Sequence, residues 1–278
     1  MNAPFAPLSK PVYRSVSPAR IGAMMLRHFY LLRASWPRLL ELIYWPLVQM
    51  LMWGFLQTWL LQQRGGVATA GGTLIGAILL WDVLIRGQQG LSVSFLEEMW
   101  SRNVANIFIS PLRPGEFLIA LMVMSVIRLF VGVVPVTLLA IWFFGFNLWS
   151  LGFGLGAFFA NLLLTAWAVG ALVSGLIVRN GLGAEGLAWT LMYLILPLCA
   201  VFYPVEILPS ALQWVAWSLP PTYVFEGLRV LLIDHVFRVD LMLWALAINL
   251  VMISVASVVF LKLVDSARRA GSLMAIGE

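Results

Sequence analysis

The sequence predicts an all-α integral membrane protein, from its composition, the length of its apolar runs and the placement of its charges. Of the 278 residues, 62% are hydrophobic and only 10% are charged, which excludes a packed soluble domain of this length. The apolar runs approach about 20 residues, the length that a helix needs to cross the hydrocarbon core of a bilayer. The N-terminal segment is polar and rich in proline, so it does not resemble a cleavable signal peptide.

Six apolar runs qualify as membrane-spanning helices. They cover residues 39–61, 73–95, 115–145, 151–177, 186–203 and 239–262. The stretch from Leu129 to Val178 contains no charged residue and is too long for one span, so it must turn once. Glycine and asparagine favour turns, which places this turn at Gly145, Phe146 and Asn147.

The basic residues gather on one side of this predicted topology. The N-terminal segment, the loops after the second and fourth spans and the C-terminal end carry Lys10, Arg14, Arg20, Arg27, Arg33, Arg38, Arg102, Arg113, Arg179, Lys262, Arg268 and Arg269. The opposite side carries only Arg64, Arg229 and Arg238. Because cytoplasmic loops are enriched in lysine and arginine, both termini are predicted to be cytoplasmic.

The chain divides into three predicted parts: a cytoplasmic segment over residues 1–38, a membrane domain over 39–262 and a cytoplasmic tail over 263–278. The first part contains an amphipathic helix over 18–36, which Ser17 can cap and Pro18 can begin. One face of it carries Ile21, Met24, Met25, Phe29, Leu32 and Trp36, flanked by Arg20, Arg27 and Arg33. We expect this helix to anchor in the headgroup region, with a partner-binding helix as the alternative.

His28 lies within the apolar arc of this helix. The expectation is that its ring snorkels toward the headgroups rather than binding a ligand.

The stretch from Phe202 to Arg229 is largely apolar but cannot form one spanning helix. Pro204, Pro209, Pro220 and Pro221 divide it, because proline removes a helical donor and clashes with the preceding turn. Each piece has roughly half the length that crosses a bilayer. We therefore predict a broken re-entrant helical hairpin between the fifth and sixth spans, on the outer side. Such backbone persists at membrane depth only beside protein or a water-filled cavity, which is typical of transport proteins.

The sequence contains no phosphate-binding loop and no Ser/His/Asp arrangement. Its only lysines, Lys10 and Lys262, do not follow a glycine-rich turn, and it has one cysteine and two histidines. We therefore expect no catalytic residue, no metal site, no cofactor in this chain and no nucleic-acid partner. If transport is driven by ATP, the ATPase with its ATP and Mg is a separate polypeptide.

Three charged residues, Asp82, Arg86 and Arg128, fall inside the second and third predicted spans. Charges at that depth are costly, so they should face protein or water. Asp82 and Arg86 are four residues apart and can pair on one helix face, and Arg128 on the neighbouring span can approach Asp82. Two interpretations remain: an intramembrane ion pair that fixes helix packing, or a polar lining of a translocation pathway.

Three stretches of the sequence resemble the membrane subunits of ABC exporters of the type-2 permease class. They are LLRASWPRLLELIYWPLVQMLMWGF at 31–55, SPLRPGEF at 110–117, and FYPVEILPSALQWVAWSLPPTYVFEGLR at 202–229. The resemblance implies a permease subunit of an ATP-driven exporter in a bacterial-type inner, or plasma, membrane. It further implies two permease copies in a homodimer, two cytoplasmic ATP-binding subunits, contact with membrane lipid, and an amphipathic, lipid-linked, glycan or drug-like substrate.

The resemblance also assigns residues to two regions. The cytoplasmic loop over 97–111 corresponds to the family's ATPase-coupling helix, with Glu97, Glu98, Trp100, Arg102, Val104, Ile107 and Phe108 as candidates. Its mixture of charged and apolar side chains suits a docking surface. The broken hairpin corresponds to the family's outer re-entrant gate, with Tyr203, Pro204, Glu206, Pro209, Pro220, Glu226 and Arg229 as candidates. Within this gate, Glu206 is expected to accept backbone donors at a helix N-terminus, and Glu226 to be solvated.

Two rival functions remain from the residues alone. An integral membrane enzyme that modifies lipids or glycans would need converging acids, bases or a metal site, which the sequence does not supply. An ion-coupled secondary transporter would commonly have an internal repeat, and the two halves of this sequence do not read as copies.

Overall fold

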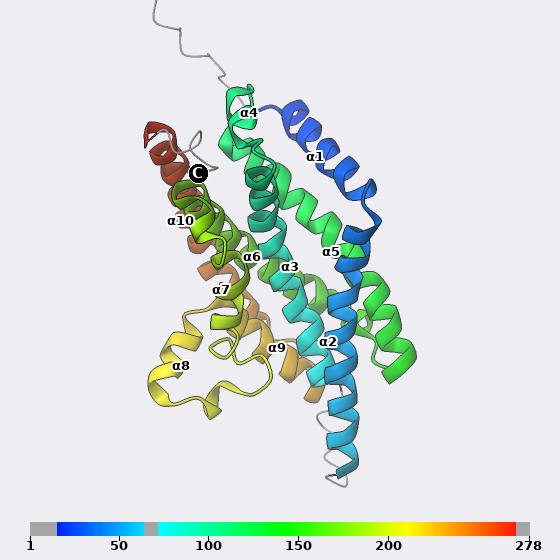
Figure 1. Ribbon diagram of the computed structural model, residues 1–278. Coiled ribbons are helices and arrows are strands. Elements are labelled where there is room, and N and C mark those ends of the chain that lie inside the picture. Colours follow the sequence, from blue (N-terminus) through cyan, green and yellow to red (C-terminus); the bar gives the residue numbers. More distant parts are fainter. Residues whose placement is uncertain (1–15, 64–71, 271–278) are drawn as a thin grey trace, which may run out of the picture.

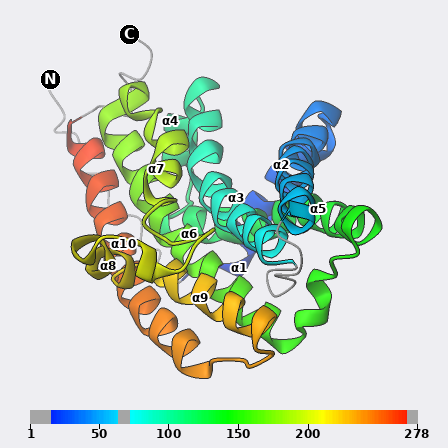
Figure 2. The same cartoon turned by 90° about the horizontal axis from the view of Figure 1, so that it is seen from below.

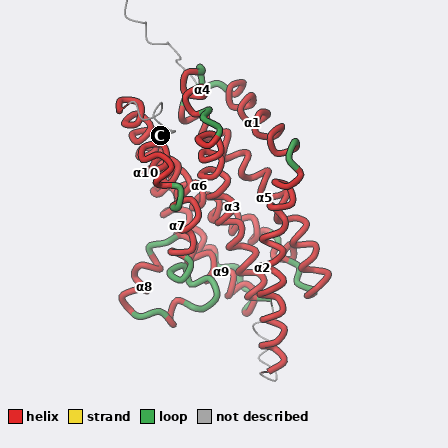
Figure 3. The backbone as a smooth tube through the Cα atoms, viewed as in Figure 1, coloured by secondary structure: helices red, strands yellow, loops and turns green. Residues whose placement is uncertain are grey.

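The computed structural model describes residues 16–63 and 72–270, and all secondary structure in these ranges is helical (Figure 1, Figure 3). The α-helices are α1 (Pro18–Arg33), α2 (Trp36–Gln63), α3 (Thr73–Trp100), α4 (Val104–Ile109), α5 (Pro114–Phe144), α6 (Phe153–Asn180), α7 (Leu187–Ile195), α8 (Ser210–Trp217), α9 (Pro220–Ile233) and α10 (Val239–Ala270). Three short 3-10 helices are η2 (Leu148–Leu151), η3 (Gly181–Ala184) and η4 (Val205–Ile207). Lys10, Arg14 and Arg64, which contribute to the predicted charge bias, lie outside the described residues.

Helix α3 lies at the centre of the bundle, between α5 and α6, and α10 packs along α6 (Figure 2). Most of α3 is buried, whereas α2 and α10 expose long apolar faces. Small residues allow the central contact: Gly87 of α3 lies against Ala166 and Leu163 of α6. Between α6 and α10, buried Asn249 donates to the backbone oxygen of Asn161 at 2.9 Å and accepts from Thr165 at 2.7 Å. These polar contacts fix the register of two otherwise apolar helices.

Within the described residues, four helices, α2, α5, α6 and α10, are long and apolar enough to cross a membrane. The predicted turn at Gly145 is confirmed, since α5 ends at Phe144 and Gly145 has a φ of +65°. Helix α3 has the length of a span, but Asp82, Arg86 and its glutamines lower its hydropathy. The predicted continuous span over 186–203 was wrong: α7 ends at Ile195, ahead of Pro197, which has no backbone N–H. Its nine residues rise about 14 Å, roughly half of a hydrocarbon core.

The two ends of the bundle differ in character. Helices α1 and α4 and the C-terminal end of α10 lie at one end, and α8 lies at the other (Figure 1). This agrees with the predicted topology, in which the N-terminal helix, the loop after α3 and the C-terminal end share one side. The stretch over 202–229 is broken into η4, α8 and α9, and Pro204, Pro209 and Pro220 stand at the beginnings of these pieces.

We expect Gly87→Ala to lower the thermal stability of the purified protein. A methyl group at Gly87 would lie 2.7 Å from the β-carbon of Ala166, which cannot rotate away, so α3 and α6 must separate. The matched control is Gly156→Ala in α6, where an added β-carbon has no atom within 4 Å. Alanine is the better helix former, so the control should keep or raise the melting temperature in detergent. Equal melting temperatures for the two variants would contradict the close contact.

Candidate functional site

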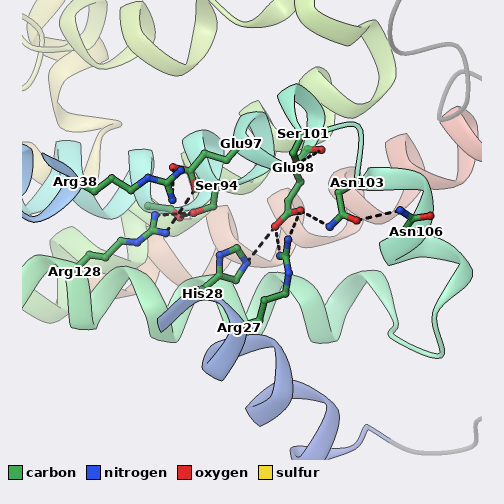
Figure 4. A network of polar contacts seen from close by, with 11 residues as sticks. Arg27, His28, Arg38, Ser94, Glu97, Glu98, Ser101, Asn103, Asn106 and Arg128 are labelled. Carbon is green, nitrogen blue, oxygen red and sulfur yellow. Dashed lines mark hydrogen bonds and ion pairs between the residues drawn. The ribbon is translucent and has the colours of Figure 1, made fainter. Parts of the chain in front are cut away.

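Glu98, in the last turn of α3, joins three elements at the α1 end of the bundle (Figure 4). Its buried carboxylate accepts hydrogen bonds from both terminal nitrogens of Arg27 in α1, one of them at 2.9 Å. It also accepts from the side chain of Asn103, directly before α4, at 2.8 Å. Because a buried carboxylate needs such partners, Glu98 ties α1 and the start of α4 to α3.

Glu116 makes a second connection, between α1 and α5. It accepts from Arg20 at 2.9 and 2.5 Å and from the backbone N–H of Ser17 at 2.8 Å. It also accepts from the backbone N–H of Arg113 at 3.0 Å, closing the first turn of α5. The sequence reasoning did not select Glu116, although a glutamate three residues after a helix cap is a recognisable signal.

The flanking arginines of α1 therefore do not all face headgroups. Arg20 and Arg27 pair with protein carboxylates, and Arg33 is exposed. The amphipathic helix itself is confirmed over Pro18–Arg33, but the side chain of Ser17 makes no capping bond.

The predicted environment of His28 was wrong: its side chain is 0% exposed and packs 6.3 Å from the ring of Phe117, centroid to centroid. The buried stripe of α1 consists of Met24, His28 and Leu32. They are four residues apart, so they lie in successive turns on the face toward the bundle. Burial lowers the pKa of His28 from 6.5 to about 4, reinforced by the positive charge of Arg128 and opposed by Glu98. Its Nε2 lies 3.9 Å from Glu98, too far for a hydrogen bond.

Arg128 of α5 does not reach Asp82, which corrects the expected approach of these two residues. Asp82 instead accepts from the Nε of Arg86 at 3.2 and 3.1 Å. Arg128 donates to Ser94 at 2.8 Å, and its other terminal nitrogen lies 3.9 Å from Glu97 (Figure 4). Glu97 also lies 3.6 Å from Arg38 of α2. The charges thus separate into a closed pair in α3 and a looser set shared by α2, α3 and α5.

Several of these side chains line a pocket of about 110 Å³. Its wall includes Arg38 and Glu41 from α2, Arg86 and Glu97 from α3, Arg128 from α5 and Trp189 from α7. Its lining also includes Leu32 of α1, and Arg86 stands in the middle of α3. The pocket brings together Arg86 and Arg128, which were predicted as site residues from the sequence, with Arg38 and Glu41, which were not.

The predicted coupling loop contains helix α4, and its candidate residues divide between core and surface. Val104 and Ile107 are buried, and Glu97 and Glu98 are engaged in the contacts above. The side chain of Phe108 lies outside the described residues. Trp100 and Arg102 are exposed, and they are joined by Asn106 and by Ile109, which is 81% exposed. Asn106 and Ile109 are three residues apart in α4 and share a face, a spacing that could have identified Ile109.

At the opposite end, Glu226 and Arg229 of α9 hold the chain before η4. Glu226 accepts from the backbone N–H of Val205 at 2.8 Å and from Arg229 at 2.7 Å, and Arg229 donates to the backbone oxygen of Val201 at 3.3 Å. Glu226 was expected to be solvated and Glu206 to accept backbone donors. The structure reverses these roles: Glu206 is exposed, and Glu226 caps η4 because α9 folds back against it.

The remaining hairpin candidates support the same segment. Tyr203 donates to the backbone oxygen of Pro197 at 2.6 Å, and Pro204 and Pro209 precede η4 and α8. Pro220 begins α9. The ring of Phe202 stacks on Trp53 of α2, with centroids 4.1 Å apart, so the hairpin also rests against α2.

A comparison with known protein families finds a match to the family described as "ABC-2 type transporter" over residues 22–233. The match runs from α1 to the end of α9 and thus includes both ends of the bundle described above. No curated protein matches the chain.

We expect the stability of the protein to fall as the pH drops from 6.5 to 4, through His28. In the unfolded chain the imidazole ring is protonated near pH 6.5, whereas in the folded protein it is protonated only near pH 4. Stability is therefore full above pH 6.5, and about 3 kcal/mol is lost on the way to pH 4. The measurement is the melting temperature in detergent against pH, for wild type and His28→Met. The variant should have a flatter curve between pH 6.5 and 4, and parallel curves would rule out this role for His28.

Proposed function

The chain belongs to the family of ABC-2 type transporters, and on that premise we propose that it is the permease subunit of an ATP-driven exporter. Family membership implies association with an ATP-binding subunit, which would hydrolyse ATP with Mg outside this chain. The proposed substrate is amphipathic, such as a lipid-linked, glycan or drug-like compound. Two copies of the permease and two of the ATPase would form the transporter, with both permease termini in the cytoplasm of a bacterial-type plasma membrane.

The observation that carries the proposal is the exposed face of α4 and the turn before it. Trp100, Arg102 and Ile109 are exposed at the same end as α1, while Val104 and Ile107 fasten the helix to the bundle. An apolar anchor within a polar surrounding is the composition of a docking surface. We therefore infer that the ATPase binds α4 on this face.

The contacts of Glu98 offer a route for coupling. Asn103, which stands directly before α4, and Arg27 of α1 bind the same carboxylate. A displacement of α4 by the ATPase would therefore act on α1 and on the end of α3 together. Helix α3 is packed between α5 and α6, so this movement would reach the centre of the bundle.

The opposite end would serve as the outer gate. We propose that η4, α8 and α9 form the re-entrant hairpin, and that α3, together with α7 and the turns that follow it, completes six membrane passages. Glu226 and Arg229 would keep this gate in place, since they bind the backbone on both sides of Phe202. The exposed apolar faces of α2 and α10 are available to lipid and to the second copy.

We expect Ile109→Asp to reduce co-purification of the ATPase subunit and ATPase activity of the complex by at least about tenfold. A charge placed in the apolar centre of a docking surface is desolvated without a partner, which weakens binding by several kcal/mol. The assay is affinity purification of the tagged permease with its ATPase, followed by measurement of ATP hydrolysis.

The matched control is Ile207→Asp, which makes the same change at an exposed isoleucine of η4, at the other end of the bundle. This variant should retain the ATPase. If Ile109→Asp and Ile207→Asp bind the ATPase equally well, α4 is not the docking surface. If the wild-type protein retains no ATPase and no ATPase subunit stimulates its transport, the exporter function itself is wrong.

A further inference from the structure

The arginine pocket, defined by Arg38, Glu41, Arg86, Glu97, Arg128 and Trp189, has unused hydrogen-bond donors. A guanidinium carries five N–H groups. Arg128 uses one on Ser94, and its other terminal nitrogen lies 3.9 Å from Glu97, beyond hydrogen-bond distance. Among the described residues, Arg86 gives only its Nε to Asp82. Guanidinium donors in a pocket wall that have no protein acceptor within hydrogen-bond distance are available to an anion that enters the pocket.

The ion pairs around Glu97 are incomplete as well. Arg38 and Arg128 share the carboxylate of Glu97 as their ion-pair partner. Their terminal nitrogens lie 3.6 and 3.9 Å from its oxygens, which is longer than a hydrogen bond. One carboxylate cannot compensate two guanidinium groups. Arg86 is compensated by Asp82, and Glu41 at the opening is exposed. The guanidinium groups of Arg38 and Arg128 therefore favour the binding of an anion in the pocket. The carboxylate of Glu41, at the exposed edge of the pocket, disfavours it.

The size and shape of the pocket indicate the kind of anion. A volume of about 110 Å³ is several times the ~30 Å³ of a water molecule and has room for a phosphate group. Guanidinium groups bind phosphate through paired N–H donors. At Glu41 the pocket adjoins a shallow groove along α2, lined by Leu40, Ile43, Tyr44 and Leu47. A polar cavity that continues into an apolar groove matches an amphiphile with a head and a tail.

We propose that the arginine pocket binds the phosphate group of an amphiphile whose apolar chain lies in the groove of α2. This inference rests on the proposed function, because it names the substrate class of the exporter as phosphate-bearing lipids or lipid-linked compounds. Arg86 and Arg128 hold the phosphate from α3 and α5, Arg38 closes on it from α2, and Trp189 borders the opening from α7. The phosphate takes the donors that Glu97 and Asp82 leave open.

The test measures binding of dodecyl phosphate to the full chain in dodecyl maltoside, by phosphorus NMR line broadening and by thermal stabilisation. Inorganic phosphate, dodecanol and dodecyltrimethylammonium are the comparison probes. We expect saturable binding of dodecyl phosphate, weaker binding of inorganic phosphate, and none of the other two at the same site. Equal affinity for inorganic phosphate would overturn the assignment of an amphiphile, and binding of dodecanol as tight as that of dodecyl phosphate would overturn the role of the arginines.

The variants give effects of opposite sign. Arg128→Gln should weaken binding of dodecyl phosphate by about tenfold or more, because charge-assisted hydrogen bonds are lost. Glu41→Gln should strengthen binding severalfold, because it removes a like charge from the opening. Arg33→Gln is the matched control: it is exposed near the same end, does not line the pocket, and should bind as the wild type does.

If Arg128→Gln does not fold, two further variants test the role of the arginines. Arg128→Lys keeps the charge but loses the planar donors, and Asp82→Asn with Arg86→Gln removes a donor without leaving a buried carboxylate unpaired. Wild-type affinity in both folded variants would overturn the proposal. The binding assay contains no ATPase, so its outcome is separate from that of the docking experiment: either result can fail while the other stands.

Discussion

The cost of burying carboxylates determines how the α1 end of the bundle is built. Glu98 and Glu116 lie at the ends of two central helices, almost fully buried, and a buried charge is tolerated only with close partners. Both receive those partners from α1. Arg20 and Arg27 are seven residues apart, so they emerge from the same face, two turns from each other. Helix α1 is thus held against α3 and α5 at two points.

This constraint explains how a helix as short as α4 keeps a defined position. Six residues do not form a stable helix in isolation. Asn103 binds Glu98 before the helix begins, and Val104 and Ile107 enter the core. The exposed side chains of Asn106 and Ile109 are then presented from a fixed base, with Arg102 in the turn before them. A displacement of α4 would therefore also move α1 and α3, because Asn103 and Arg27 bind the same carboxylate.

Local features of this fold were predictable from the sequence, and long-range pairings were not. Pro18 and the apolar spacing of the first helix placed α1, and Gly145 with Asn147 placed the turn between α5 and α6. The partners of Arg20 and Arg27 lie 96 and 71 residues away, so periodicity could not distinguish a lipid-facing arginine from a paired one. The same limit reversed the roles of Glu206 and Glu226, since only the return of α9 brings Glu226 to the backbone of Val205. His28 was misplaced because an apolar arc does not indicate whether lipid or protein covers it.

The charges of α3 separate into complete and incomplete sets, and this difference carries functional meaning. Glu98 is fully engaged by Arg27 and Asn103, and Asp82 is engaged by Arg86, as expected for groups that only hold helices together. Around Glu97 the pairs to Arg38 and Arg128 are long, at 3.6 and 3.9 Å. A set selected for packing alone would be expected to close these contacts, because a charge-assisted hydrogen bond is stronger than a long ion pair. These long pairs border a pocket that adjoins an apolar groove at Glu41, which is where the proposed ligand would complete them.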